Sequence, residues 1–144
     1  MIYRLGFGDV GEVRGAVELV VPRVGPARYE AVFSGEELGD GFLVVRDLEV
    51  PPPRRADVIE LRGDGLWVEM TCETPDEHWS FGLEAFGLRV DDPEEAVGDR
   101  IPVGYDLEWE TPDLVHGELL VGSARFGIAA TGTWELEVDG GELL

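Results

Sequence analysis

Short runs in which apolar and polar residues alternate dominate this sequence, and turn-forming residues separate them. Side chains of a β-strand point alternately to the two faces of its sheet, so the pattern predicts strands with one buried and one solvated face. Glycine-rich breaks at 62–65, 39–41 and 139–141 predict tight turns. The predicted strands are 2–7, 13–21, 28–34, 41–50, 57–62, 65–73, 77–90, 101–110, 114–121, 124–130 and 133–138.

Many short strands at regular spacing favour an all-β fold, either an antiparallel barrel or a sandwich. We predict a lipocalin-like antiparallel β-barrel of about 8–10 strands, which removes sheet edges and can hold one small ligand. A sandwich of the same strands would leave no cavity. The only helix signal is one turn at 92–95, with Asp92 as its cap. No linker or repeat divides residues 1–144, which we interpret as a single β-barrel domain.

The charge of the chain excludes several classes of partner. The 144 residues include 31 acidic and 11 basic side chains, which gives a net charge of −20. Such a surface repels phosphate backbones and anionic lipids, so we expect neither nucleic acid nor a membrane as a partner. The sequence shows no bilayer-spanning apolar run, no secretory leader pattern and a single cysteine, Cys72. These features predict a soluble, cytoplasmic protein in a reducing compartment.

All the basic residues are arginine, and the chain lacks lysine, asparagine and glutamine. A GC-rich genome explains this bias most simply, and adaptation of an acidic protein to high salt is the alternative. Without lysine, no side chain can form a Schiff base. Any site must therefore use carboxylates, arginine, histidine, aromatic side chains, hydroxyls and backbone groups.

The sequence lacks the signatures of metal, cofactor and nucleophile sites. His78 and His116 are the only histidines, and no HExxH or CxxC spacing groups them with Cys72. A site of two histidines and one carboxylate could still assemble across strands, but we predict no metal and no cofactor. No serine lies in a GxSxG context, and the strand pattern around Cys72 favours apolar packing of its thiol. No glycine-rich loop joins a strand to a helix, so phosphate and dinucleotide sites are not expected.

Carboxylates among aromatic residues are the candidates for chemistry. In YDLEWE (105–110), alternation puts three acids on one face and three large apolar side chains on the other, which favours solvated acids outside a core. In HWSFGLEAFGLRV (78–90), Glu84 shares a face with His78 and Ser80, and also with Phe86 and Leu88. A carboxylate kept dry and protonated there could donate to a carbonyl or an alkene. A solvated outer face is the alternative.

Aromatic side chains fall in most of the predicted strands, where core packing is their commonest use. The inward-facing set of a barrel also forms the wall of any pocket, and aromatic walls suit an apolar ligand. Within 78–90 we predict an inward face and a bend at Gly82 or Gly87. The candidate substrate-binding residues are Tyr29, Phe33, Trp67, Trp79, Phe81, Leu83 and Trp109, of which Trp79, Phe81 and Leu83 form that inward face.

A resemblance to a known family covers roughly residues 28–122. It rests on the segments RYEAVFSGEELGDGFLVVRDLEVPPP, LWVEMTCETPDEHWSFGLEAFGLRVDDPEEA, GDRIPVGYDLEWE and VHGELLVG. These resemble an uncharacterised actinobacterial family within the lipocalin-like carotenoid hydratase and AttH-like superfamily. The resemblance implies antiparallel β-barrels, usually two per chain, and relatives that hydrate carotenoids, cyclise tocopherol precursors or catalyse intramolecular cycloaddition.

The chain departs from the larger members of that superfamily in two respects. Their next strand carries a polar motif with histidine, whereas GIAATGTWELEV here has Trp134 and no histidine. The sequence also spans one barrel's worth of residues. The resemblance therefore implies a single-barrel variant, with a homodimer that covers one exposed face.

Three functions remain open at this stage. The first is a cofactor-independent cyclase or pericyclase, similar to a Diels–Alderase, which folds a hydrophobic polyene or polyketide intermediate of specialised metabolism into a reactive conformer. Its catalytic residues would be Glu84 as acid, Tyr105 as hydrogen-bond donor and His78 as an orienting group. The second is a non-catalytic binder of an apolar small molecule. The third is a structural or interaction module with a filled core, which lacks the cavity of about 300 Å³ that a ligand needs.

Overall fold

The computed structural model describes residues 1–8 and 12–138. The turn predicted at 139–141 lies outside these residues. The described part of the chain forms ten β-strands and one 3-10 helix. They are β1 (Ile2–Phe7), β2 (Arg14–Val20), β3 (Ala27–Ser34), η1 (Glu36–Leu38), β4 (Phe42–Val50), β5 (Val58–Gly63), β6 (Leu66–Thr74), β7 (His78–Val90), β8 (Asp99–Glu110), β9 (Leu114–Val121) and β10 (Ala124–Glu137).

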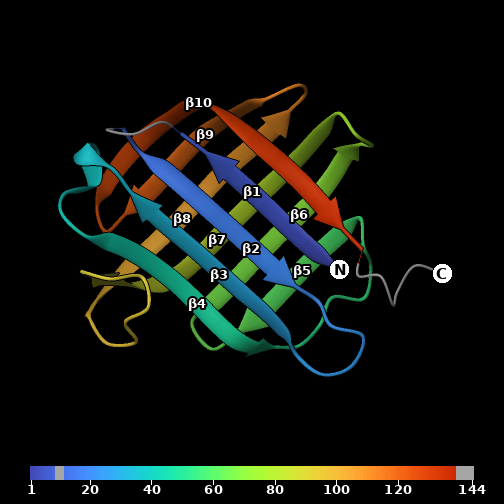
Figure 1. Cartoon of the computed structure of the whole chain (residues 1–144), viewed down its shortest axis with the longest axis horizontal. Coiled ribbons are helices and arrows are strands. Elements are labelled where there is room, and N and C mark those ends of the chain that lie inside the picture. Colours follow the sequence, from blue (N-terminus) through green and yellow to red (C-terminus); the bar gives the residue numbers. More distant parts are fainter. Residues whose placement is uncertain (9–11, 139–144) are drawn as a thin grey trace.

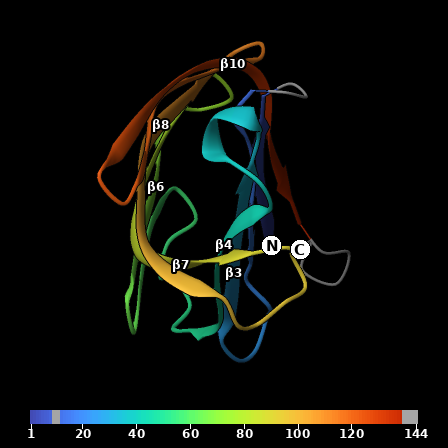
Figure 2. The same ribbon diagram turned by 90° about the vertical axis from the view of Figure 1, so that its left-hand side faces the viewer.

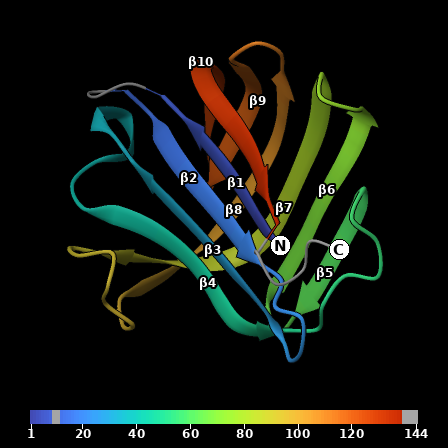
Figure 3. The ribbon, with the colours of Figure 1, turned by 45° about the vertical axis from the view of Figure 1, so that its right-hand side comes forward.

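The strands form one antiparallel sheet in the order β4-β3-β2-β1-β10-β9-β8-β7-β6-β5 (Figure 1). A further pairing between β4 and β7 closes eight of these strands into a barrel. The hairpin of β5 and β6 continues the sheet beyond β7 (Figure 3). The predicted all-β barrel, with a lipocalin-like fold, is confirmed.

The barrel is flattened into two curved layers (Figure 2). Strands β1 to β4 form one layer, strands β5 to β9 form the other, and β10 bends from one to the other. Strand β7 joins the layers at the opposite side, because it pairs with β6 as far as Ala85 and with β4 from Leu88. Gly87 lies at this change of partner, and a side chain there would lie 2.9 Å from Val103 Cγ2. One of the two predicted bends therefore marks a barrel corner.

The C-terminal part of the barrel corrects the predicted pair of strands 124–130 and 133–138. It is one continuous strand, β10, which pairs with β9 up to Thr131 and with β1 from Gly132. Gly132 faces the carbonyl oxygen of Gly6, and a Cβ atom added there would lie 2.5 Å from Val115 Cγ2. The glycine therefore allows a close approach of backbones at a corner, where we had predicted an interruption.

The helical turn predicted at 92–95 is a single hydrogen-bonded turn and not a helix, in which the Glu95 amide donates to the Asp92 carbonyl oxygen at 3.0 Å and the Asp92 side chain caps the turn as predicted. The Glu94 amide donates to Asp92 Oδ1 at 2.9 Å, and the Asp92 amide donates to Glu95 Oε1 at 2.9 Å. The Arg46 guanidinium then takes the carbonyl oxygens of Pro93 and Glu95 as acceptors, so the segment is held as a turn against β4. The only helix in the described residues is η1, which the alternation pattern did not indicate.

Side chains from both layers fill the interior of the barrel. Tyr29, Phe33, Leu43 and Leu107 each have 0% of their surface exposed. A cavity large enough for a ligand would leave exposed surface on the side chains that line it. The inward faces of these strands therefore form a packed core. No helix in the described residues is long and apolar enough to cross a membrane.

Candidate functional site

Most of the predicted binding residues belong to the packed interior. Trp79, Phe81 and Leu83 are 6%, 1% and 2% exposed, which confirms the predicted inward face of β7. Trp79 lies with Trp134 in an aromatic cluster, with ring centroids 4.7 Å apart, and Phe81 lies 4.9 Å from the same ring. These rings contact one another across the barrel end, as in an ordinary aromatic core.

Tyr29 and Tyr105 meet at the centre of the barrel. Their hydroxyl oxygens lie 2.9 Å apart, with one hydroxyl donating to the other. Burial raises the pKa of both phenols above the usual value. Tyr105 therefore uses its hydroxyl to join the two layers, and it does not present that group to a cavity. Trp109, from the same strand face, keeps its buried indole N–H without a partner among the described residues.

The remaining catalytic candidates, Glu84 and His78, lie on the outer face of the barrel. The Glu84 side chain is exposed to solvent. His78 is partly buried and pairs through Nε2 with Glu108 Oε1 at 2.7 Å, while the Ser80 hydroxyl donates to Glu73 Oε1 at 3.0 Å. The wall of the barrel thus separates Glu84 and His78 from Tyr105. The predicted set of three does not assemble into one site.

Trp67 also faces outward, unlike the other predicted binding residues. It precedes the buried Val68 on β6, and in the sheet it lies directly opposite Glu84 on β7. Its ring stands over Gly82, since a Cβ atom at that glycine would lie 3.5 Å from the ring. On the outer face of β6 to β9, Trp67 lies in one surface hollow with Phe86, Pro102 and Leu120, and such a contiguous apolar patch is typical of a binding surface.

Two neighbouring hollows of about 510 Å³ and 390 Å³ cover this outer face. They share Trp67, Glu84, Gly104 and Leu120, so we treat them as one surface, the outer groove. The end toward the first hollow is apolar, with Phe86 and Pro102, and the end toward the second is acidic. The lining of the outer groove is Gly65, Leu66, Trp67, Glu69, Ser80, Phe81, Gly82, Leu83, Glu84, Ala85, Phe86, Pro102, Val103, Gly104, Tyr105, Asp106, Glu118, Leu120 and Gly122.

The strand register explains why the groove is shallow in the middle and charged at one end. One outward row runs Trp67, Glu84, Gly104, Leu120 across β6 to β9, and the next runs Glu69, Gly82, Asp106, Glu118. The two glycines contribute no side chains, and the Trp67 ring lies over Gly82 while Leu120 Cδ1 lies 3.7 Å from where a Cβ atom of Gly104 would be. Asp106 and Glu118 lie directly opposite each other, and Arg125 compensates one of the two charges, with its Nη1 3.6 Å from Glu118 Oε2. The described part of the chain offers Asp106 no hydrogen-bond or ion-pair partner.

The other end of the groove carries the only aromatic–cation contact found in the described residues. The Arg100 guanidinium lies 4.2 Å from the centre of the Phe86 ring. Phe86 is nevertheless 51% exposed, a large fraction for a phenylalanine. The groove therefore already contains one example of the contact between a cation and an aromatic ring that Trp67 offers to a ligand.

Other reactive groups do not form a site. Burial raises the pKa of the Cys72 thiol, and Asp57, Asp76 and Glu73 raise it further, which disfavours the nucleophilic thiolate. His116 pairs with Glu110, with Nε2 and Oε2 3.1 Å apart. Among residues 1–8 and 12–138, no three metal-ligating side chains lie close enough to hold an ion.

Comparison with known proteins adds no relative. No protein-family model, curated protein or solved structure matches the chain. The structure shows the fold, a lipocalin-like β-barrel of eight strands with a two-stranded extension. Function must therefore be argued from the outer groove itself.

The sequence predicted Glu84 and Trp67 as site residues of an interior cavity, and it did not predict the outer groove that they line. The alternation of residues along the strand does indicate that Trp67 faces outward. In LWVEMT, Trp67 alternates in step with Glu69, on the face opposite Leu66 and Val68, so it belongs to the solvated side. Leu120 gave no such signal, because apolar residues surround it in the run HGELLVG.

Proposed function

We propose that this chain is a non-catalytic binding module whose outer groove holds a basic peptide segment with an aromatic side chain. The observation that carries the proposal is Trp67, an outward-facing indole whose ring stands over Gly82 and lies beside Glu84. That arrangement offers an apolar ring and a negative charge within one site.

The apolar end of the groove suits the aromatic side chain. Trp67, Phe86 and Leu120 provide apolar walls beside Gly104. Burying an aromatic ring there removes apolar surface of both partners from water, and ring pairs contribute further when they stack edge to face. Four residue steps along β7 separate Gly82 from Phe86, which corresponds to about 13 Å, or roughly four residues of an extended peptide.

The acidic end suits the positive charges that flank that side chain. Glu69, Asp106 and Glu118 occupy one row, and Glu84 stands between them and the apolar end. A guanidinium or ammonium group placed here can pair with Asp106, which has no partner in the described residues, and can also stack on Trp67. The net charge of −20 attracts a basic partner from a distance and repels nucleic acid and anionic lipid.

A function that places the ligand inside the barrel has weaker support. A cyclase that folds an apolar chain by shape, or a carrier of an apolar molecule, needs space inside the barrel. The side chains predicted to line that space pack against one another, with Tyr29 and Phe33 at 0% exposure and Tyr105 at 3%. Among the functions that the sequence left open, the filled interior favours the interaction module.

Calorimetric titration with short capped peptides tests the proposal. The probe contains the sequence Arg-Phe-Arg, and its comparison peptides contain Arg-Ala-Arg and Glu-Phe-Glu. We expect the first to bind, with an affinity that falls as salt is added because the charges are solvent-exposed. The alanine peptide should bind at least about tenfold more weakly, and the acidic peptide should not bind.

Matched protein variants locate the binding. Glu84→Gln and Glu49→Gln each remove one exposed negative charge, but Glu49 lies on β4 and does not line the groove. We expect Glu84→Gln to weaken the Arg-Phe-Arg peptide and Glu49→Gln to leave it almost unchanged. Equal effects of the two variants would show that the peptide responds to net charge alone, which would overturn the proposal.

A further inference from the structure

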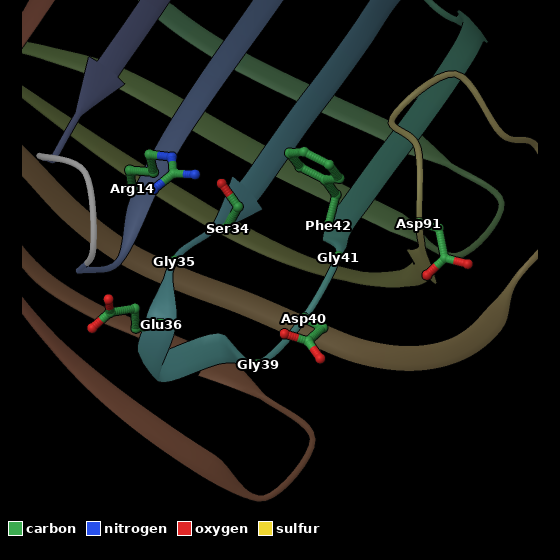
Figure 4. A pocket seen from close by; sticks show the side chains of 9 residues that line it. All are labelled: Arg14, Ser34, Gly35, Glu36, Gly39, Asp40, Gly41, Phe42 and Asp91. Atoms are coloured by element: carbon green, nitrogen blue, oxygen red, sulfur yellow. The ribbon is translucent and has the colours of Figure 1, made fainter.

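A second hollow lies on the other layer of the barrel, beside η1, and shares no lining residue with the outer groove. It has a volume of about 590 Å³ and opens at the barrel end where β2, β3 and β4 meet the loop of η1 (Figure 4). We call it the η1 pocket. Its polar members are Arg14, Ser34, Glu36, Asp40 and Asp91, and Phe42 provides an aromatic wall.

One wall of the η1 pocket offers unused hydrogen-bond donors. Arg14 and Ser34 are directly paired in register on β2 and β3, so their side chains lie next to each other on the outer face. Ser34 is only 7% exposed, and its hydroxyl lines the pocket without a hydrogen-bond partner in the described part of the chain. Arg14 has no carboxylate partner there either, unlike Arg4 and Arg46, which bind glutamates.

A guanidinium and a hydroxyl that lie side by side, both without a hydrogen-bond partner in the described residues, can hold one ligand group together. The guanidinium presents a planar fork of N–H donors that matches the two oxygens of a carboxylate, and a hydroxyl can donate a further hydrogen bond. This wall therefore fits the carboxylate of a ligand.

The opposite wall carries negative charge. Figure 4 shows Asp91 on the far side of Phe42 from Arg14 and Ser34, Asp40 below Phe42 on the loop after η1, and Glu36 on the same side as Arg14. Asp91 directly follows Val90, whose register partner is Phe42, so the sheet places the acid beside the aromatic ring. The pocket therefore has one cationic group at Arg14 and an acid across the aromatic ring from it, with two further acids at the rim.

The rim of the η1 pocket is fixed by the backbone. Gly35, Gly39 and Gly41 have φ angles of 137°, 85° and 82°, values that other residues rarely adopt. A Cβ atom at Gly41 would lie 2.5 Å from the Val90 carbonyl oxygen. The buried Leu38 anchors the loop, and its carbonyl oxygen accepts a hydrogen bond from Arg89 Nη1 at 2.9 Å. The rim of the pocket is therefore set by the backbone before any ligand binds.

We propose that the η1 pocket binds a free amino acid with a cationic side chain. The ligand carboxylate lies on Arg14 and Ser34, its aliphatic stem lies on Phe42, and its positive groups face Asp40 and Asp91. Three carboxylates, including Glu36, stand against one guanidinium, so a ligand with a net positive charge balances the pocket better than a neutral one. This proposal stands independently of the function assigned to the outer groove.

Calorimetry with L-lysine as the probe tests this site. We expect saturable binding of one lysine per chain, and at least about tenfold weaker binding of both cadaverine and L-glutamate. Cadaverine keeps the positive charges without the carboxylate, whereas glutamate keeps the carboxylate without the additional cation. Absence of lysine binding, or equal binding of lysine and cadaverine, would overturn the proposal.

Variants separate a specific site from general charge effects. Arg14→Gln should raise the Kd for lysine by at least about tenfold, and Ser34→Ala should raise it by a smaller factor. Arg54→Ala removes an exposed arginine that does not line the pocket, and it should leave the Kd unchanged. Circular dichroism checks that each variant is folded, and Arg14→Lys supplies a second conservative change. If Arg54→Ala weakens lysine as much as Arg14→Gln does, the assigned pocket is wrong.

Discussion

The hydroxyl oxygens of Tyr29 on β3 and Tyr105 on β8 lie 2.9 Å apart at the centre of the barrel. The two strands belong to opposite layers, so this hydrogen bond crosses the interior and connects two faces that otherwise meet through apolar contacts. Phe33 adds an edge-to-face contact with the Tyr105 ring, with centroids 6.1 Å apart. The centre of the barrel thus contains one specific polar contact, which lies inside a filled core.

Removing one of the two hydroxyls should destabilise the barrel. Tyr105→Phe leaves the buried Tyr29 hydroxyl without its partner, and we expect the free energy of unfolding to fall by about 1–3 kcal/mol. Combining it with Tyr29→Phe should cost less than the sum of the two single changes, because no hydroxyl is then left unpaired. Urea denaturation of the four proteins measures this coupling. If the losses of stability in the two single variants add up to the loss in the double variant, the buried hydrogen bond is contradicted.

The same pair predicts a loss of stability at alkaline pH. Burial raises the pKa of both phenols above the value of about 10 for an unfolded tyrosine. Below that pH, both states are protonated and the contribution is fully present. Above it, the unfolded state releases protons that the folded state retains, so the free energy of unfolding falls as pH rises toward the raised values.

Urea denaturation at about pH 9 and about pH 11 measures this loss. The wild type should lose more stability over this interval than the double variant that has phenylalanine in place of Tyr29 and Tyr105. The chain has no lysine, so few other groups titrate in the same range. Equal losses in the two proteins would show that other groups cause the alkaline effect.

Trp79 faces the core and Trp67 faces outward, so we predict different losses of stability when each is replaced by alanine. Trp79→Ala removes a ring that is 6% exposed and contacts Trp134, so we expect a loss of about 3–5 kcal/mol of stability. Trp67→Ala removes an outward-facing ring, and we expect it to cost about 1 kcal/mol or less while it abolishes peptide binding in the outer groove. Thermal unfolding and calorimetry separate these effects. A large loss of stability in Trp67→Ala would show that this ring is mainly structural.

Two glycines of β10 provide a matched test of the barrel corner. Gly132→Ala would place a methyl group against the Gly6 carbonyl oxygen and 2.5 Å from Val115 Cγ2, so we expect a loss of about 1–3 kcal/mol. Gly127→Ala meets nothing within 4 Å and should be neutral or slightly stabilising. Chemical denaturation compares them directly. Similar behaviour of the two variants would contradict the continuous strand.

The fold could be predicted from the sequence because alternation reports directly on which face of a strand is buried. In YDLEWE, Tyr105, Leu107 and Trp109 are the buried set, as the pattern indicated, and the three acids face outward. Closure through β4 and β7 could not be predicted, because it depends on a change of pairing partner near Gly87. Nor could η1, which three residues form between glycines.

The candidate sites were harder to predict than the fold. An aromatic residue in a strand looks the same in sequence whether it packs in a core or lines a pocket, so Tyr29 and Phe33 were assigned to a cavity that side chains fill. Trp67 differs from these residues only in its position in the alternating pattern, which places it on the outward face of β6 with Glu69. Arg14 and Ser34 gave no signal, because their pairing depends on the register between β2 and β3.

The most direct test of the central claim is a nuclear magnetic resonance titration of the labelled protein with the Arg-Phe-Arg peptide. The four tryptophan indole N–H groups report on both sides of the barrel wall. We predict that the Trp67 indole and the amides of Gly82 and Gly104 shift, while the signals of the buried Trp79 and Trp109 stay in place. Shifts concentrated on those two buried indoles would place the ligand inside the barrel and contradict the outer groove as the functional surface.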